Sequence, residues 1–231
     1  MILAAHQPQY LPWLGFFDKM TRADVFVLLD CPQYKKREFQ NRNRIKSPHG
    51  AIWLTVPVLS TSRRFQRIRD VEINNTVYWR NKHWKSIEQH YRKAPFWSDH
   101  ASAIQAFYGA EWSSLCDLNM AMFRHYVQVL GITTTFRVES EVGTTRTNTE
   151  RLIELCKKLG ATCYLSGAGG KDYMDESRFA QEGIELRYHQ YGHPVYRQMY
   201  PDLPFAPFMC ILDLLFNEGP GSLRVLRGET P

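Results

Sequence analysis

Short apolar runs separated by polar loops open the chain. Residues 2–5 and 25–30 each have the length and apolar character of a buried strand, and residues 15–20 between them have the length of a short helix. Two strands joined through a helix pair in parallel, with a right-handed crossover. The first thirty residues therefore predict the start of a parallel sheet.

A hairpin and a polar loop are predicted next. Residues 43–45 and 51–58 read as two strands around a Ser-Pro-His-Gly segment at residues 47–50, in which proline and glycine supply turn geometry. Residues 60–69 are polar and are predicted to form a mobile loop.

Residues 77–130 follow a helical pattern. Trp84, Ile87 and Tyr91 recur at helical spacing, and Asp99 is placed to cap a second helix. A third apolar stripe over residues 115–129 ends at Gly131, a residue suited to terminate a helix. We interpret this stretch as a helical insertion.

The second half of the chain alternates between strands and helices. Strands are predicted at residues 132–138, 162–165 and 184–188. Helices are predicted from Thr147 or Asn148 to Gly160, shortly before residue 184, and over residues 208–216 up to Gly219. This alternation is typical of an α/β fold with an open, mostly parallel sheet and flanking helices, formed by residues 1–231 as a single domain.

Length and composition agree with one soluble domain. The chain has 231 residues, 44% of them hydrophobic, which is enough for one sizeable core. No apolar run reaches the roughly 18 to 20 residues of a membrane span, and the first residues lack the charged and apolar regions of a signal peptide. Five scattered cysteines form no C-x-x-C pair, which argues against a disulfide framework or a zinc knuckle. We expect a cytoplasmic protein.

The positive charge is concentrated in one region. Of the formal net charge of +6, residues 35–93 contribute fifteen Lys and Arg against four Asp and Glu, a balance of +11, so the remainder carries −5. Such a region is suited to face an anion: a phosphate, a sugar nucleotide, a nucleic acid or an acidic membrane surface. A solvated basic face is the alternative.

The loop at residues 6–13 carries the first candidate site, because ligands of open α/β sheets bind beyond the carboxyl ends of the strands. Two prolines fix its backbone. Its candidate residues are His6, Gln7, Gln9, Tyr10 and Trp13. Gly15 then allows close approach at a helix start, where phosphate is attracted. The alternative is that the histidine and the aromatic rings only bond and pack locally.

The loop after the second predicted strand offers acids, amides and cations. Asp30 and Gln33 lie at its start. If residues 43–45 form a strand, Arg42, Arg44 and Lys46 project from one face, with Asn43 between them, an arrangement suited to phosphate or carboxylate. The alternative is an exposed edge strand that its charges protect from pairing.

A third loop, residues 166–175, combines small and polar residues. Its candidates are Ser166, Gly167, Gly170, Lys171, Asp172, Tyr173 and Asp175. The loop has neither the Walker A pattern nor a G-x-G-x-x-G turn, and no G-x-S-x-G elbow surrounds its serine. No metal site is predicted, since Gly192 and Pro194 make a metal-binding helix improbable at His189 and His193.

Several uncommon motifs, in order, resemble the WbqC-like protein family. They are His-Gln-Pro-Gln-Tyr-Leu-Pro-Trp-Leu-Gly-Phe-Phe from residue 6, Asn-Arg-Asn-Arg-Ile-Lys from residue 41 leading to Trp-Leu-Thr-Val-Pro, Tyr-Leu-Ser-Gly from residue 164 and Ile-Leu-Asp-Leu-Leu-Phe-Asn from residue 211. Genes of this family commonly accompany O-antigen and other surface-polysaccharide genes. The resemblance implies a role in making or modifying an activated sugar, with aminoacylation (glycyl transfer) of an amino sugar as one form, in lipopolysaccharide biosynthesis.

A more distant resemblance is to pantothenate synthetase and other nucleotidylyltransferases. It is carried, in the same order, by His6, by Pro32-Gln33-Tyr34 and by Gly170-Lys171-Asp172-Tyr173. The first loop lacks the paired histidine of that group, with Gln9 the nearest polar residue, and the second motif lacks its spacer. This likeness implies a nucleotidylyltransferase-like (HUP-type) sheet and, as cofactor, ATP with magnesium; the sequence itself fixes no cofactor.

The resulting hypothesis is a transferase or ligase that moves an acyl, aminoacyl or adenylyl group and binds a phosphate-bearing substrate such as an amino-sugar nucleotide. Its catalytic residues are His6, Lys171 and Asp30. On this hypothesis His6 and Lys171 stabilise developing charge, residues 42–46 hold phosphates, and Tyr10 and Trp13 flank a base or sugar. Asp30, Asp172 or Asp175 would hold hydroxyls or a magnesium ion, and in acyl transfer His6 would be the base. All these groups are expected to surround one anion.

Two other function classes remain open. Aromatic residues interleaved with the cations of residues 35–93 also suit nucleic-acid binding, of transfer RNA for example, and an aminoacyl-tRNA donor would combine both readings. The third class is a non-catalytic protein that binds a sugar nucleotide.

Overall fold

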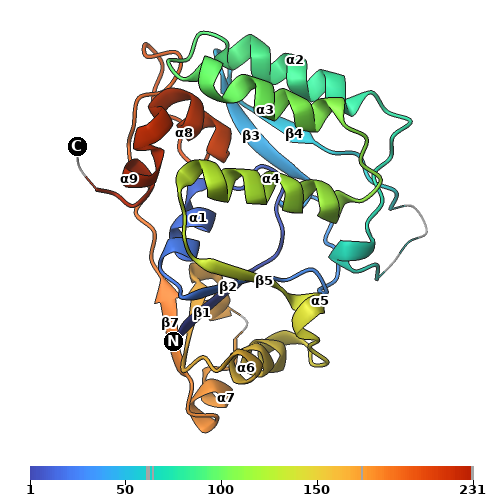
Figure 1. Cartoon of the computed structure of the whole chain (residues 1–231), viewed down its shortest axis with the longest axis vertical. Coiled ribbons are helices and arrows are strands. Elements are labelled where there is room, and N and C mark those ends of the chain that lie inside the picture. Colours follow the sequence, from blue (N-terminus) through green and yellow to red (C-terminus); the bar gives the residue numbers. More distant parts are fainter. Residues whose placement is uncertain (61–62, 64, 173, 230–231) are drawn as a thin grey trace.

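A five-stranded parallel sheet lies in one half of the molecule in the computed structural model, which describes residues 1–60, 63, 65–172 and 174–229 (Figure 1). Its strands are ordered β5-β2-β1-β6-β7. Their bounds are β1 Ile2–His6, β2 Val25–Leu28, β5 Thr135–Val138, β6 Cys163–Gly167 and β7 Glu185–His189. The α/β fold with an open parallel sheet is confirmed, and each of its strands overlaps a predicted one.

The strand order reverses at β1. From β1 the chain moves outward to β2 and β5, then returns to the other side of β1 and moves outward through β6 to β7. Leu3 of β1 therefore pairs with Val25 on one side and with Tyr164 on the other. In a doubly wound sheet of this kind, the crevice beyond the carboxyl ends of the strands at the reversal is the usual place for a ligand.

Each face of the sheet has its own core, because side chains alternate along a strand. Ala4 packs in the larger core, on the side of α1 (Leu14–Thr21) and α4 (Leu115–Leu130). Leu3 and Ala5 pack in the smaller core, on the side of α6 (Asn148–Leu159) and α7 (Glu176–Gln181). His6, two residues after Ala4, consequently lies on the α1 side.

The larger core continues into a second layer above the sheet in Figure 1. The predicted hairpin is confirmed as β3 (Arg42–Ser47) paired antiparallel with β4 (Gly50–Thr55). Beside it lie α2 (Trp79–Tyr91) and α3 (Trp97–Gly109), the first two of the three predicted middle helices, and α8 (Ile211–Glu218). One continuous core thus joins the hairpin and the helices to the sheet.

Some boundaries differ from prediction. Asp99 does not cap α3, because the helix begins two residues earlier, after Phe96. Helix α8 begins at Ile211 rather than at residue 208, because Phe208 has a left-handed backbone (φ 60°) and Cys210 bridges to Trp13. Five short elements were not predicted: α5 Glu139–Val142, α9 Ser222–Leu226, and the 3₁₀ turns η1 Ile68–Asp70, η2 Ala168–Asp172 and η3 Gly219–Gly221.

The helix ends at Gly131 and Gly160 are confirmed. Both glycines adopt left-handed φ values, 66° and 72°, that favour a residue without a side chain. Across the part of the chain that the structure describes, no helix is both long and apolar enough to cross a membrane.

Candidate functional site

A buried lysine lies at the point where the strand order reverses. Lys19 extends from α1, and its Nζ donates to the backbone oxygen of Ala5 in β1 at 2.9 Å. The same Nζ lies 3.9 Å from the position that a Cβ on Gly167, in β6, would take. Lys19 therefore brings an amine between the carboxyl ends of the two strands that flank the reversal.

This amine is buried without a countercharge in the described part of the chain. Lys19 is only 4% exposed, and within the described residues no carboxylate pairs with it. Burial lowers the pKa of Lys19 from 10.5 to about 7, since desolvation disfavours the ammonium form. Buried lysines are normally paired, so an unpaired one at the carboxyl ends of the strands is typical of a functional group rather than a structural one.

His6, at the end of β1, stands beside the lysine. Its Nδ1 lies 3.1 Å from the backbone oxygen of Gln7, and because a carbonyl only accepts, Nδ1 carries the proton. Burial, followed by the charge of Lys19, lowers the pKa of His6 to about 3. The ring is therefore neutral at physiological pH, with Nε2 as a hydrogen-bond acceptor.

An ion-paired cluster lies on the β7 side of Lys19. His189 Nε2 lies 2.5 Å from Asp18 Oδ2, and Arg22 holds the same carboxylate through two hydrogen bonds of 2.7 and 3.0 Å. Burial works against the Asp18 carboxylate, but the hydrogen bonds from His189 and Arg22 outweigh it and lower its pKa. Asp18 is thus satisfied by other partners and leaves the adjacent Lys19 uncompensated.

The first loop reaches from His6 into the core. Gln7 accepts a hydrogen bond from Gln40 at 2.6 Å, which fastens the loop to the segment before β3. Tyr10 is fully buried, and its hydroxyl bonds His83 at 2.8 Å and Tyr108 at 2.7 Å. The prediction that Tyr10 flanks a base or sugar is therefore wrong: it anchors the loop.

Gln9 and Trp13 have different surroundings. Gln9 is buried, and its Oε1 has no hydrogen-bond partner among the residues described. Trp13 is partly buried between Tyr191 and Phe208, with ring centroids 5.5 and 5.7 Å away. Its indole covers Gly15, where a Cβ would lie 2.2 Å from the ring. This glycine makes room for the indole, so the prediction that it admits a phosphate is wrong.

The hairpin forms a second, separate basic surface, which we call the hairpin face: Phe39, Arg42, Arg44, Trp53 and Phe208. The Arg42 and Arg44 guanidinium carbons lie 4.3 and 5.4 Å from the Trp53 ring centre. Trp53 itself is 44% exposed. The predicted projection of both arginines from one face of β3 is confirmed.

Two other residues of β3 have structural partners. Asn43 is fully buried and donates to Leu11 O at 2.6 Å, so its predicted substrate-binding role is wrong. Lys46 is also buried, and its backbone N–H donates to the Tyr91 hydroxyl, which in turn donates to buried Asp213. The Lys46 ammonium interacts electrostatically with the Asp213 carboxylate. It is therefore not available on the surface beside Arg42 and Arg44.

The third loop lies mainly on the other side of the sheet. Lys171 is exposed, with its Nζ 5.1 Å from the ring centre of Tyr188, whose hydroxyl donates to Glu176 of α7. Ser166, in register with Tyr188, turns to the same α7 side. Since His6 faces α1, the structure separates Lys171 from it.

The remaining residues of this loop are structural or exposed. Gly170 packs on Ser166, where a Cβ would lie 2.0 Å from Oγ. Asp175 caps α7 by accepting from Ser177 N at 3.1 Å, and its predicted ligand role stays a prediction. Asp172 is exposed, and Tyr173 lies outside the described residues.

Asp30 lies in a cluster with Cys31 and Glu139, whose ligand atoms are all within 4.8 Å of one another. These groups already have partners. Asp30 accepts from Ser140 N at 3.0 Å, and Glu139 pairs with Arg151 at 2.8 Å. Burial, with the two neighbouring carboxylates, raises the pKa of the Cys31 thiol to about 11. With a guanidinium in place and the thiol protonated, the cluster does not fit a magnesium ion.

The structure thus does not bring the predicted groups around one anion. Within the described part of the chain, no contact joins Arg42, Arg44 or Lys171 to His6, and Gln33 lies apart, bridged to Arg67. Sequence reasoning missed Lys19. A signal was present, because an Asp-Lys pair interrupts the apolar run of a short helix.

Comparison with known proteins gives a family but no structural precedent. The model of the WbqC-like protein family matches residues 7–225. A protein of Mycobacterium tuberculosis, described as "Uncharacterized protein Rv1507c", is 36% identical over 230 residues, 97% of this chain and 98% of that protein. A search of the solved structures finds no match.

Proposed function

The chain belongs to the WbqC-like protein family, and we propose that it is a group-transfer enzyme that binds a phosphate-bearing substrate at Lys19 and His6. One observation carries the proposal: Lys19 is a buried amine without a carboxylate partner among the described residues, at the reversal point of a doubly wound sheet. A bound anion would supply the charge that the described residues do not.

An anion would also change the chemistry of His6. The Lys19 charge is the second cause of the low His6 pKa, after burial. A phosphate placed against Lys19 would offset that charge and raise the pKa of His6. The imidazole would become a better base when substrate is bound than when the site is empty.

Acyl transfer to an amino sugar is the reaction that the family resemblance implies. The amine nitrogen attacks the acyl carbon, the new N–C bond forms, and the bond from that carbon to its leaving group breaks. His6 Nε2 accepts the proton that the nitrogen loses, and Lys19 holds the phosphate of the nucleotide-linked sugar. The donor is an activated acyl group, such as an acyl adenylate or an aminoacyl-tRNA, and the reaction would take place in the cytoplasm.

Ligand binding tests the proposal directly. A nucleotide-linked amino sugar should raise the melting temperature of the wild-type protein, since ligand at a hundred times its dissociation constant stabilises by about 2.7 kcal/mol. Lys19→Met should abolish that shift, whereas a change at exposed Lys85, Lys85→Met, should preserve it. Equal shifts in wild type and Lys19→Met would contradict the proposal.

Pyrophosphate release distinguishes two forms of the reaction. If the enzyme itself activates the acid with ATP, purified protein should release pyrophosphate when given ATP and glycine. If it takes an acyl group activated elsewhere, no pyrophosphate should appear, while N-acylated sugar nucleotide should form from a supplied donor. Absence of both products with a bound sugar nucleotide would favour the non-catalytic binding class.

The hairpin face supports a second candidate function, binding of RNA. Two guanidinium groups flank an exposed indole, and within the described residues no carboxylate pairs with either. Such stacking and charge suit single-stranded bases and their phosphates. Affinity for transfer RNA should fall steeply with salt, and the double variant Arg42→Gln, Arg44→Gln should reduce the salt slope. A salt-independent affinity, or one unchanged in the variant, would exclude this role for the hairpin face.

A further inference from the structure

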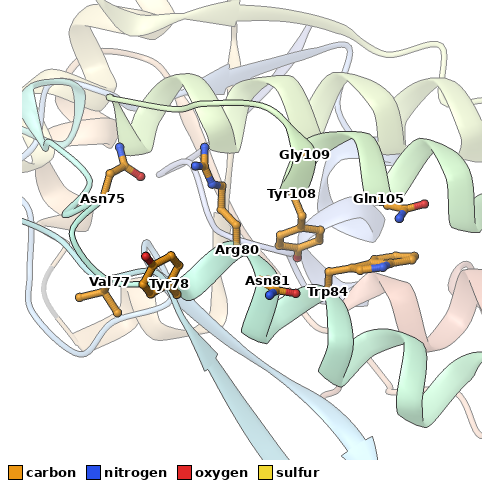
Figure 2. Close-up of a pocket in the computed structure, with 9 residues that line it drawn as sticks. All are labelled: Asn75, Val77, Tyr78, Arg80, Asn81, Trp84, Gln105, Tyr108 and Gly109. Atoms are coloured by element: carbon orange, nitrogen blue, oxygen red, sulfur yellow. The ribbon is translucent and has the colours of Figure 1, made fainter.

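A pocket of about 360 Å³ lies in the helical layer, apart from Lys19 (Figure 2). It opens between the loop before α2, the first turns of α2 and the last turns of α3. Its volume falls within the roughly 300 to 1,000 Å³ that small-molecule sites occupy. Tyr78, at its rim, is 83% exposed, so the pocket is accessible from solvent.

Aromatic rings form its walls. Trp84 is stacked on Trp97, with ring centroids 5.5 Å apart and planes at 24°, which fixes the indole. Tyr108 lies 6.5 Å from Trp84 at an angle of 34°, and its hydroxyl is held by Tyr10 of the first loop at 2.7 Å. These rings are tilted and do not form a parallel slot of the kind that clamps a flat base.

Two amides on facing helices are free for a ligand. Asn81 of α2 and Gln105 of α3 line the pocket (Figure 2), both are exposed, and in the described structure neither side chain has a hydrogen-bond partner. Asn75, in contrast, is engaged with Trp112 O at 2.8 Å and Trp79 Nε1 at 3.3 Å. Each free amide offers two donors and one acceptor, the mixture that hydroxyl groups need.

The pocket carries little charge that is free to pair with an ionic ligand. Its lining contains no carboxylate, and its one cation, Arg80, donates to Ala110 O at 2.7 Å and lies 3.9 Å from Glu111. We propose that this pocket binds a neutral sugar ring, with the hydroxyls on Asn81 and Gln105 and an apolar ring face against Trp84. The proposal is independent of the reaction proposed for Lys19 and adds a second carbohydrate site.

Saturation-transfer NMR and titration calorimetry test the site with neutral methyl pyranosides. The ligand concentration is about 10 mM, because a single ring bound by few contacts should have millimolar affinity. At least one pyranoside should bind wild type. The double variant Asn81→Ala, Gln105→Ala should weaken that binding about tenfold or more through the loss of both hydrogen-bonding amides. Gln89→Ala, a change of an exposed amide elsewhere on α2, should leave it unchanged.

Lys19→Met separates the two sites: pyranoside binding should persist in it even though nucleotide-sugar binding is lost. The proposal is overturned if no pyranoside binds, if the double variant binds as wild type does, or if uncharged nucleosides bind in place of sugars and respond to the double variant. The exposed positions of Asn81 and Gln105 make their removal compatible with folding, which circular dichroism of the variant checks.

Discussion

Lys19→Met should make the protein more stable at neutral pH while removing its proposed ligand site. The wild-type ammonium is buried without a carboxylate partner in the described structure, and burial lowers its pKa from 10.5 to about 7. Methionine has a similar length and no charge to desolvate. A residue that costs stability where it stands is expected at a functional site.

The magnitude follows from proton linkage. Between pH 7 and 10.5 the unfolded chain keeps a proton on Lys19 that the folded protein has released, so the stability of wild type rises with pH in that window. Each pKa unit corresponds to about 1.36 kcal/mol, and the fall from 10.5 to about 7 therefore corresponds to ~5 kcal/mol. Below pH 7 the full cost is present; near pH 10.5 it has disappeared.

The assay is urea denaturation of wild type and Lys19→Met at pH 6, 7, 8, 9 and 10. The free-energy difference in favour of the variant should be largest at pH 6 to 7 and shrink by about 1.4 kcal/mol per pH unit above pH 7. Ionisation of tyrosines and cysteines is common to both proteins and cancels in the difference. Exposed Lys85, changed to Met, serves as the control, for which the difference should stay flat.

A pH-independent difference between wild type and Lys19→Met would refute the reasoning, because it would show that Lys19 keeps the same proton in the folded and unfolded states. A variant that is less stable than wild type at every pH would refute it as well, since the lysine would then have a stabilising partner.

Three further changes test the surroundings of the site, each by urea denaturation. Gly15→Ala should destabilise by about 1 to 3 kcal/mol and alter tryptophan fluorescence, because its Cβ would displace the Trp13 ring; an unchanged spectrum would contradict this. Asp18→Asn should cost about 2 kcal/mol at pH 7 by weakening the pairs with His189 and Arg22. That cost should be complete above pH 3.8 and should decrease as the pH falls from 3.8 through the lowered pKa of folded Asp18; a cost that does not decrease on acidification would disprove it. Asp213→Asn should cost about 3 kcal/mol, because a buried carboxylate that accepts three hydrogen bonds would be lost, and a neutral effect would exclude that network as a stabilising element.

The sheet was predictable because its signals are local. Strands such as residues 2–5 are apolar runs between polar loops, and Gly131 and Gly160 end helices through their own backbone freedom. The hairpin was predictable for the same reason, since its turn residues and its alternation of Arg42 and Arg44 with buried positions are written in consecutive residues.

The site was harder to predict because its residues come together only when the strands and helices are packed in their final order. His6 was found from its place at a strand end, but the side chain that it meets, Lys19, stands on a helix whose orientation no local pattern gives. Tyr10 was misjudged because a polar aromatic residue in a loop can turn inward when a buried side chain, here His83, can hydrogen-bond its hydroxyl. Lys171 was misjudged because the face of the sheet that it occupies depends on the pairing of β6 with β7.

Proton uptake on ligand binding tests the central claim, that Lys19 and His6 form an anion site, most directly. Calorimetric titration of a nucleotide-linked amino sugar, whose diphosphate diester does not titrate near neutrality, is carried out at pH 8 in buffers of different ionisation enthalpy. Lys19 with a pKa of about 7 is only ~10% protonated at pH 8, so an anion that restores its charge should draw nearly one proton from the buffer. At pH 6 the uptake should be close to zero, and Lys19→Met should show neither uptake nor binding. Binding to wild type without uptake at pH 8, or binding of equal strength to Lys19→Met, would contradict the account.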